Sequence, residues 1–447
     1  MRHIPKIIEF VVKKDLCTGC GLCITQCSNQ SLIMDWNDFG FLIPKQTNDC
    51  SLDAECIKVC PFNPFPDDEV KTEDELADIF LEKDSKTHKN IGKYHRIYVG
   101  YSNKFRFSSS SGGLATYLAS KLLENKIVNH VVSVIATEKQ GNYYEYSIVS
   151  NFKNLLRASK TKYYPVTLSD VFLKINELEG NVAIVGIACF IKSIRLKQYY
   201  QPELKKKIPF LIGIICGGIK SAFFSEYLAG RAGIKDNNFL NPEFRIKDFE
   251  SSSSDYSYGC FDFKGNSYEI KMRVVGDMWG TGMFKNNACD FCDDVTTELA
   301  DISLGDAWFS PYNLDGRGTN VIVTRSSLAE KLINDGIINK ELFVEDLTLD
   351  KFLESQSGSF NHRQKALNYR VQNLKKRNII MPPKRHDSDK ISVDFQLVQK
   401  QRMKIRAKSL ILWRKFHDAF HFDLKMKRSL LTLKTFTKIN HLIRKFK

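Results

Sequence analysis

The sequence predicts an α/β protein with α+β parts, preceded by a small cysteine-rich domain and followed by a helical tail. Two observations favour this class. Apolar strand-like runs alternate with helical patterns over most of the chain, as in sheets flanked by helices. Cysteines gather in two groups within the first 61 residues. We therefore expect a cysteine-rich domain at 1–68, a linker at 69–93, a mixed α/β body at 94–375 and a tail at 376–447.

Size and composition set the first limits. The 447 residues are 43% hydrophobic, which is enough for a large core. No run of about 18 apolar residues occurs, and the first six residues lack the pattern of a signal peptide. A cytoplasmic location is therefore expected. Twelve cysteines in such a chain favour metal ligands over disulfides, because a reducing compartment keeps thiols free.

The first cysteine group has the spacing of a bacterial two-cluster ferredoxin. Residues 17–27 follow the pattern C-x2-C-x2-C-x3-C. This spacing lets thiolates on one tight loop bind the irons of a 4Fe-4S cluster, while Gly19 and Gly21 let the backbone wrap around it. A ferredoxin-like N-terminal domain is therefore expected, with ligands Cys17, Cys20, Cys23 and Cys27.

The second group repeats the pattern with Asp53 in place of its second cysteine. In such pairs the fourth cysteine of each motif binds the other cluster. One predicted set is therefore Cys17, Cys20, Cys23 and Cys60, and the other is Cys27, Cys50 and Cys56 with Asp53 facing the open iron. Asp53 could bind the fourth iron of a four-iron cluster, or fail to bind it so that a three-iron cluster forms. It could also be a surface residue without a ligand role. Zinc is less favoured, because zinc pairs are spaced more widely.

Strands and helices alternate along the body. We expect buried strands at 130–136, 181–186, 210–215 and 300–305, helices at 114–124, 190–199 and 222–232, and antiparallel strands within 244–275. A short helix at 73–82 is expected inside the linker. The alternation of strands with helices is typical of a sheet that is covered by helices.

Four cysteines of the body could form a further site. Cys189 and Cys216 follow predicted strands at the edge where open α/β sheets bind ligands. Cys289 and Cys292 have chelating C-x2-C spacing, so the four could be ligands of one cluster. Single cysteines are more often core residues, and the pair alone is ambiguous. Cys260 is expected to be structural.

Residues 108–113, Ser-Ser-Ser-Ser-Gly-Gly, precede the predicted helix at 114–124. Free backbone N–H groups and the positive helix end could bind a phosphate there, although a capped loop without function is an equal alternative. The chain has no Walker or G-x-G-x-x-G motif, and its nine histidines form no metal or triad pattern. No catalytic residue is therefore named.

Together these segments resemble the coenzyme F420 hydrogenase/dehydrogenase beta subunit family, in which F420 denotes a deazaflavin coenzyme. The resemblance covers residues 95–350 and rests on Ser111-Gly112-Gly113 with Thr116, Lys162-Tyr163, Val185-Gly186 through Cys189, Cys216-Gly217-Gly218, Cys289 with Cys292, and Glu298 to Trp308. It implies a flavoprotein body with FAD beside a 4Fe-4S cluster. The implied cluster ligands are Cys189, Cys216, Cys289 and Cys292, and the implied flavin contacts are Ser111, Gly112, Gly113 and Lys162. Nothing in these residues marks a deazaflavin pocket.

The last 64 residues are strongly basic. They contain 18 Lys and Arg against 5 Asp and Glu, whereas residues 1–383 contain 48 against 46. Hydrophobic residues follow helical spacing at Leu412, Phe416, Ala419, Phe420, Leu433, Phe436, Ile439, Leu442, Ile443 and Phe446. Such helices could lie on an anionic membrane surface, or pack back on the body with a solvated basic face. Nucleic acid binding is not indicated for the body.

Three functions stay open at this point. The first is a flavin-dependent oxidoreductase, in which FAD exchanges a hydride with an organic substrate and passes single electrons to or from three clusters. The second is a non-catalytic, ferredoxin-like electron carrier for a partner enzyme. The third is a membrane-docked accessory protein of glycan assembly. The resemblance implies this because bacterial chains of this kind are often encoded beside genes for surface polysaccharides. Either a redox partner protein or a small-molecule substrate is expected.

Overall fold

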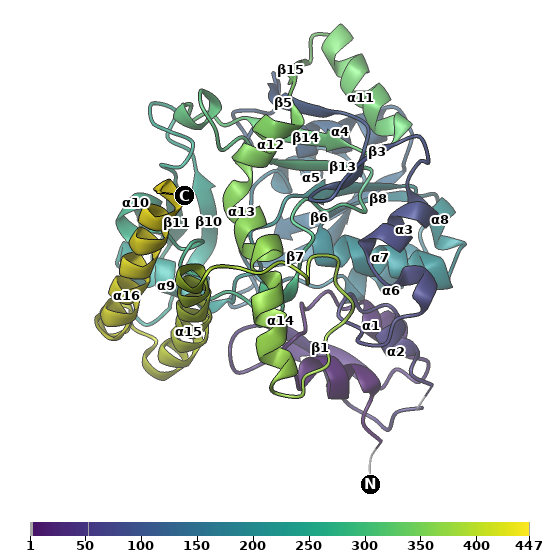
Figure 1. Ribbon diagram of the computed structural model, residues 1–447. Helices are drawn as coiled ribbons and strands as arrows, with labels where there is room; N and C mark the ends of the chain where they lie inside the picture. Colours follow the sequence, from purple (N-terminus) through teal and green to yellow (C-terminus); the bar gives the residue numbers. More distant parts are fainter. Residues whose placement is uncertain (1–2, 52, 447) are drawn as a thin grey trace.

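The computed structural model describes residues 3–51 and 53–446. Its centre is an eight-stranded mixed sheet surrounded by helices (Figure 1). From edge to edge the strands are β15 (Leu342–Asp346), β5 (Ile97–Ser102), β14 (Asn320–Thr324), β13 (Ile302–Asp306), β9 (Phe210–Ile214), β8 (Val182–Ile187), β6 (His130–Ala136) and β7 (Tyr144–Val149). The four strands from β13 to β6 are parallel, and the others pair antiparallel. The mixed α/β class is confirmed.

Alternate residues of the parallel strands pack into two separate cores. In β8, Ala183 contributes to a core with α4 (Leu114–Glu124) and α11 (Ser327–Ile338). Its neighbours Val182 and Ile184 contribute to a second core with α7 (Ala188–Tyr200). Because side chains alternate along a strand, the two cores lie on opposite faces of the sheet. Burial on both faces explains why these strands are continuous apolar runs in the sequence.

The predicted strands and helices of the body agree with the structure to within two residues at most of their ends. The body also contains shorter helices and strands that were not predicted. A separate antiparallel sheet contains β10 (Leu240–Ile246), β11 (Ser257–Phe261) and β12 (Ser267–Lys271), as expected within 244–275, and ends in the helical turn α10 (Met272–Val275). The remaining helices of the body are α5 (Phe152–Arg157), α6 (Ser169–Ile175), α8 (Leu204–Lys207), α9 (Phe223–Ala232), α12 (Leu349–Ser355) and α13 (Ser357–Phe360).

The N-terminal segment docks directly on the body. It contains α1 (Leu22–Thr25), the antiparallel pair β1 (Leu32–Trp36) and β2 (Leu42–Gln46), and α2 (Glu55–Lys58). Gly21 has a φ of +84°, and a Cβ there would lie 2.1 Å from Thr167 Oγ1. The N–H of Leu168 donates to the carbonyl of Cys20 at 2.9 Å. The glycines of the first cysteine loop therefore permit close packing against the body as well as a tight turn.

The segment expected as a linker is packed against the body. It contains α3 (Glu73–Phe80), β3 (Lys86–His88) and β4 (Gly92–Tyr94). The helix begins with a capping box, in which Thr72 accepts from backbone N–H and Glu75 bonds back to the Thr72 N–H. Val70 and Leu76 are buried in the core that contains α7. The segment is thus part of the folded unit, and the four domain limits stay predictions.

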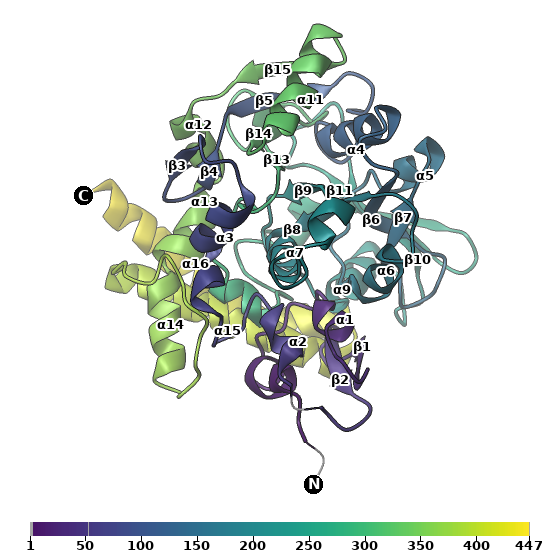
Figure 2. The same ribbon diagram turned by 90° about the vertical axis from the view of Figure 1, so that its right-hand side faces the viewer.

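The C-terminal region is helical, as expected. Its helices are α14 (Leu367–Lys375), α15 (Val393–Phe416) and α16 (Ala419–Lys445), and both views place α14 beside the N-terminal segment (Figures 1 and 2). Trp413, Phe422 and Met426 are fully buried in one core with Tyr227 and Phe284 of the body. One face of the tail therefore packs back on the body. Among the described residues, none of the helices has both the length and the hydropathy that a membrane crossing requires.

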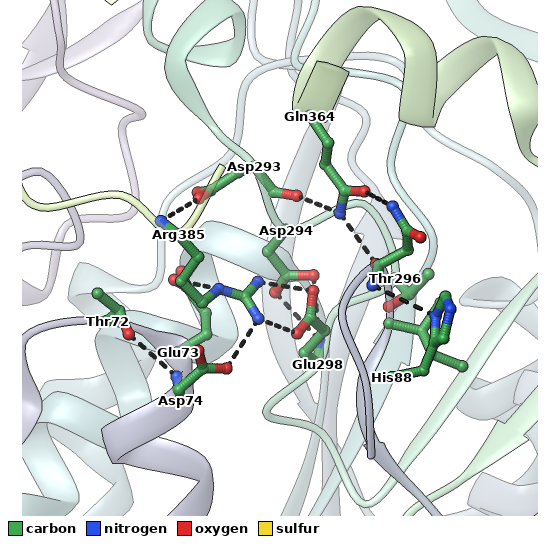
Figure 3. A network of polar contacts seen from close by, with 12 residues as sticks. Thr72, Glu73, Asp74, His88, Asp293, Asp294, Thr296, Glu298, Gln364 and Arg385 are labelled. Carbon is green, nitrogen blue, oxygen red and sulfur yellow. Dashed lines mark hydrogen bonds and ion pairs between the residues drawn. The ribbon is translucent and has the colours of Figure 1, made fainter. Parts of the chain in front are cut away.

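Buried ion pairs connect three segments that are far apart in the sequence (Figure 3). Arg385 donates to both carboxylate oxygens of Glu298, at 2.7 and 2.8 Å, and to Asp74 of α3 at 3.0 Å. Lys384 lies 3.2 Å from Asp293. Removing one partner of such a pair leaves a buried charge, which is costly. The pairs therefore hold the chain after α14 against α3 and against the loop that follows Cys292.

Replacement of Trp413 by alanine should destabilise the folded chain, because it empties a site packed by Tyr227, Phe284 and Phe422 and leaves Glu226 without its 2.7 Å hydrogen bond. The expected loss in the free energy of unfolding is about 3–5 kcal/mol, measured by urea unfolding under anaerobic conditions. Phe420→Ala is the matched control, since Phe420 is 73% exposed on the same tail. Equal midpoints for both variants would contradict the packing described here.

Candidate cysteine sites and cofactor cavity

The first predicted cysteine set is brought together from both N-terminal motifs. Burial raises the pKa of Cys23 well above its ordinary value, and the neighbouring thiols of Cys20, Cys17 and Cys60 raise it further. Cys60 follows α2, whereas the other three lie around α1. The Sγ of Cys17 accepts from the Gly19 N–H at 3.4 Å. The geometry has the crossed pattern expected of a two-cluster ferredoxin, and iron ligation by these thiols stays a prediction.

The second set gathers at the outer end of the N-terminal segment. Burial is the main cause that raises the pKa of Cys56 to about 11, and the thiols of Cys27 and Cys50 raise it further. Cys27 Sγ accepts from the Ser31 N–H at 3.3 Å. Cys27 and Cys50 are partly exposed, whereas Cys56 is buried. Cys17 and Cys60 of the first set are partly exposed as well.

Asp53 lies beside the second set, where its carboxylate also interacts with neighbouring polar groups. It accepts from the Ser28 hydroxyl, from the Ser51 hydroxyl at 2.9 Å and from the Glu55 N–H at 3.1 Å. These hydrogen bonds, led by that from Ser28, lower the pKa of Asp53. Asp53 is thus a carboxylate near Cys56, and its role as an iron ligand stays a prediction.

The four body cysteines come together from three segments. The register of the parallel pair sets Ile187 of β8 beside Ile214 of β9, so the chain leaves both strands at one level, directly before Cys189 and Cys216. Cys289 and Cys292 lie in and after a 3-10 turn at 287–291. Burial raises the pKa of Cys189 well above its ordinary value, and the Cys292, Cys289 and Cys216 thiols raise it further.

Backbone N–H groups point at the body thiols. Ile219 donates to Cys289 Sγ at 3.2 Å, and Gly218 donates to Cys216 Sγ at 3.3 Å. Hydrogen bonds of this kind stabilise the thiolate form that binds iron. Within the part of the chain that the structure describes, no group of three His, Cys, Asp or Glu residues could hold a single metal ion. Cys189, Cys216, Cys289 and Cys292 stay predicted ligands of a 4Fe-4S cluster.

The body set adjoins the first N-terminal set. The Cys20 thiol is close enough to Cys189 to raise its pKa. It also donates to the Ser193 hydroxyl at 3.5 Å, one helical turn after Cys189 on α7. Ser193 in turn donates to the carbonyl of Val59 at 2.7 Å, next to Cys60. The two four-cysteine sets are therefore neighbours in space.

A cavity of about 290 Å³ lies at the carboxyl edge of the parallel strands. Open α/β sheets bind ligands at this edge. One part of its wall is Cys216 of the body set, and another is the serine loop before α4. Aromatic side chains also line it, namely Tyr146, Tyr163, Tyr164, Phe190 and Trp279. Aromatic walls suit a flat ring system.

Basic side chains line the same cavity. Burial, followed by the charge of Lys160, lowers the pKa of Lys162 to about 7, and its Nζ donates only to a backbone carbonyl at 2.8 Å. Burial also lowers the pKa of Lys220 well below its ordinary value. Arg245 pairs with Asp306 at 2.7 Å, while its Nε is buried without a hydrogen-bond partner among the described residues. An anionic ligand such as a phosphate would satisfy these groups.

Three of the four predicted flavin contacts line this cavity. Ser111, Gly113 and Lys162 are part of its wall. Gly113 has a φ of +84° at the start of α4, which favours glycine. Gly112 serves packing instead, because a Cβ there would lie 2.7 Å from Asn320 Oδ1. Flavin binding by these residues stays a prediction.

Three basic residues of the cavity wall, Lys160, Lys220 and Arg245, were missed from the sequence. Lys220 follows Cys216-Gly217-Gly218 by two positions, so its place after a predicted strand could have indicated it. Arg245 is on β10 of the smaller sheet, and nothing in the local pattern marks it. Its approach to the cavity depends on how the two sheets pack, which no local spacing reveals.

Comparison with known proteins places the body in one family. The model for the N-terminal part of the coenzyme F420 hydrogenase/dehydrogenase beta subunit matches residues 97–172. The model for the C-terminal part matches residues 179–349. Together the two models cover more than half of the chain, including the cavity wall from Ser109 to Asp306 and all four body cysteines.

Individual relatives are distant. A coenzyme F420-dependent sulfite reductase of Methanocaldococcus jannaschii is 24% identical over 348 residues, which are 75% of this chain and 48% of the relative. A ferredoxin of Pyrobaculum islandicum is 34% identical over 61 residues, 14% of this chain and 54% of the ferredoxin. The chain thus spans about half the length of each. A chain of the F420-reducing NiFe hydrogenase complex of Methanosarcina barkeri has the same fold, with a TM-score of 0.50 and 17% identity over 64% of this chain and 96% of that one.

Replacing Cys189 by serine should remove one cluster from the protein, because this thiol is central to the body set. We expect a loss of about four irons per chain in iron and sulfide assays of anaerobically purified protein. Cys260→Ser is the matched control, since Cys260 is equally buried but lies in the core with Tyr258, outside the three sets. Unchanged iron in both variants would count against a cluster in the body.

Proposed function

Because this chain belongs to the coenzyme F420 hydrogenase/dehydrogenase beta subunit family, we propose that it is an iron–sulfur flavoprotein oxidoreductase, moving electrons between FAD and 4Fe-4S clusters. One observation carries the proposal. The wall of the cationic, aromatic cavity includes Cys216, a member of the four-cysteine body set. A cofactor in the cavity would therefore lie against a cluster. The family membership supports an electron-transfer role, and the cofactor and the number of clusters are part of the proposal.

The residues of the cavity fit FAD. Lys162, Lys220 and Arg245 offer positive charge and an unused N–H to a diphosphate, and Tyr163 and Trp279 offer ring faces. When bound, a flavin can exchange two electrons with an organic substrate and single electrons with a cluster. The protein's part is to bind the cofactor, to exclude water from it and to hold it against the body set. No residue is assigned to proton transfer.

The order of the cysteine sets supports a relay. The cavity adjoins the body set, the body set adjoins the set of Cys17, Cys20, Cys23 and Cys60, and the second N-terminal set follows, with Cys27 and Cys50 partly exposed. Electrons would enter or leave near Cys50, where a redox partner protein could dock. Cluster potentials span about −700 to +450 mV, so geometry does not set the direction of flow.

The non-catalytic carrier is the alternative function. It would use the same cysteine sets without turnover of a substrate at the cavity. Clusters without bound flavin would favour the carrier, whereas bound flavin with turnover of a soluble substrate would favour the oxidoreductase. Service to bacterial surface polysaccharide synthesis stays a prediction about the substrate.

A second proposal concerns the outer face of α16. Phe420, Leu424, Leu431 and Leu442 are each more than half exposed, and their spacing places them on one helical face. Exposed lysines, Lys427, Lys434 and Lys438, lie on the same side of the helix, Lys438 within this stripe. Apolar side chains with lysines among and beside them suit an anionic membrane surface, to which each basic residue contributes about 1 kcal/mol. Peripheral membrane contact through this face is therefore proposed.

Lys162→Met should lower the flavin content of the purified protein, because it removes a basic group from the cavity wall. Flavin is released by acid and measured by fluorescence, and the expected result is a several-fold lower ratio of flavin to protein. Lys153→Met is the control, because Lys153 is exposed on nearby α5. Wild-type protein that carries full clusters but no flavin would contradict the flavin site.

Leu424→Asp with Leu431→Asp should abolish co-sedimentation with vesicles that contain phosphatidylglycerol, because charges interrupt the exposed stripe. Vesicles of phosphatidylcholine lack anionic charge, so the wild-type protein should not co-sediment with them. The control Leu314→Asp should still co-sediment with the anionic vesicles, because Leu314 is 68% exposed on the body, outside α16. Wild-type protein that stays in the supernatant with anionic vesicles would refute the membrane proposal.

A further inference from the structure

Arg363 reaches the body cysteine set from outside the region that the family models match. It lies in a π-helical turn, Asn361–Lys365, and its side chain is buried. Its Nη2 donates to Cys292 Sγ at 2.8 Å. Its Nε donates to the Cys292 carbonyl at 3.0 Å, and its Nη1 donates to the Cys216 carbonyl. One guanidinium thus holds two of the three segments that carry the body cysteines.

The residues on either side keep Arg363 in place. Gln364 donates to the carbonyls of Asn90 and Asp293, at 2.9 and 3.0 Å. His362 shares a 2.9 Å hydrogen bond with Gln399 of α15. The position of the guanidinium is therefore set before any cofactor binds, and the C-terminal helices take part in setting it.

The charges around the body thiols are dominated by this side chain. Arg363 is the strongest charged influence on Cys292 and on Cys216, and it favours their thiolate forms. Lys285 faces Cys289, although it is paired with Asp290. Near Cys292, Lys384 is paired with Asp293. Burial raises the pKa of the neighbouring Asp294, which favours its neutral form. Among the described residues, Arg363 donates to three carbonyls and one thiol and forms no ion pair with a carboxylate.

A fixed cation beside a ligand sulfur changes the energy of reduction. A cluster held by thiolates gains one negative charge when it accepts an electron, and a buried positive charge attracts the reduced form more strongly than the oxidised form. A hydrogen bond to the ligand sulfur acts in the same direction. Arginine stays protonated at every pH at which proteins fold, so the effect is permanent. By contrast, the Cys17 thiol of the first N-terminal set is near the carboxylate Asp15.

We propose that Arg363 is a positioning residue that raises the reduction potential of the body cluster relative to the N-terminal clusters. It acts through its N–H donation to Cys292 Sγ and through its buried charge. The inference rests on the proposed function, in which Cys189, Cys216, Cys289 and Cys292 hold a cluster. The body cluster would then accept an electron more readily than it would without Arg363.

The test is a redox titration of full-length, anaerobically purified Arg363→Gln, followed by electron paramagnetic resonance, with iron and sulfide assays on the same sample. The body signal is identified as the one that disappears in Cys189→Ser. The expected result is a lower potential for that signal, with the two N-terminal signals unmoved. Arg414→Gln, an exposed arginine on α15, is the control and should move none of them.

Arg363→Lys keeps the test decisive if the glutamine variant binds less iron. Lysine retains the charge but cannot donate to Cys292 Sγ and to both carbonyls together, so a smaller shift in the same direction is expected. An unmoved body potential in a fully loaded variant would overturn the role of Arg363 and leave the proposed function intact. A wild-type protein without a signal that depends on Cys189 would overturn the proposed function itself, and this inference with it.

Discussion

The parallel pairing of β8 with β9 is the constraint on which the rest of the site depends. Its register sets Ile187 beside Ile214, so both strands end at one level and deliver Cys189 and Cys216 to the same edge of the sheet. The cavity opens at that edge, because the strands β6, β8, β9 and β13 all point their carboxyl ends toward it. A shift of one residue would turn every side chain of a strand to the other face and disrupt the packing of both cores.

The C-terminal region completes this arrangement from outside the family core. Arg385 pairs with Glu298, Trp413 fills the core beside Phe284, and Arg363 contacts Cys292. A chain cut at the end of the matched region would leave Glu298 as a buried, unpaired carboxylate and would expose the apolar surface around Phe284. The basic residues of the tail therefore have two different roles. Some are buried and pair with carboxylates of the body, and others are solvated.

Local patterns predicted the parts of the protein that local spacing determines. The strand at 130–136 and the helix at 114–124 were placed at their observed ends, because each is a continuous apolar or amphipathic run. Motif spacing alone predicted which N-terminal cysteines lie near one another, while their grouping as cluster ligands stays a prediction. Arg245 and Arg363 could not be predicted, because each reaches its site through packing between segments far apart in the chain. The segment around α3 was expected to be a linker, because it is rich in charged residues. The buried apolar residues Val70 and Leu76 stand among them and form no clear pattern in the sequence.

The most direct test of the account is quantitation of iron, sulfide and flavin in anaerobically purified protein, with electron paramagnetic resonance spectra before and after reduction. The account predicts about 12 irons and one FAD per chain, or slightly less iron with an oxidised three-iron signal if Asp53 leaves one corner of its cluster open. About 8 irons without flavin would contradict it, because the body set would then hold no cluster and the cavity no cofactor.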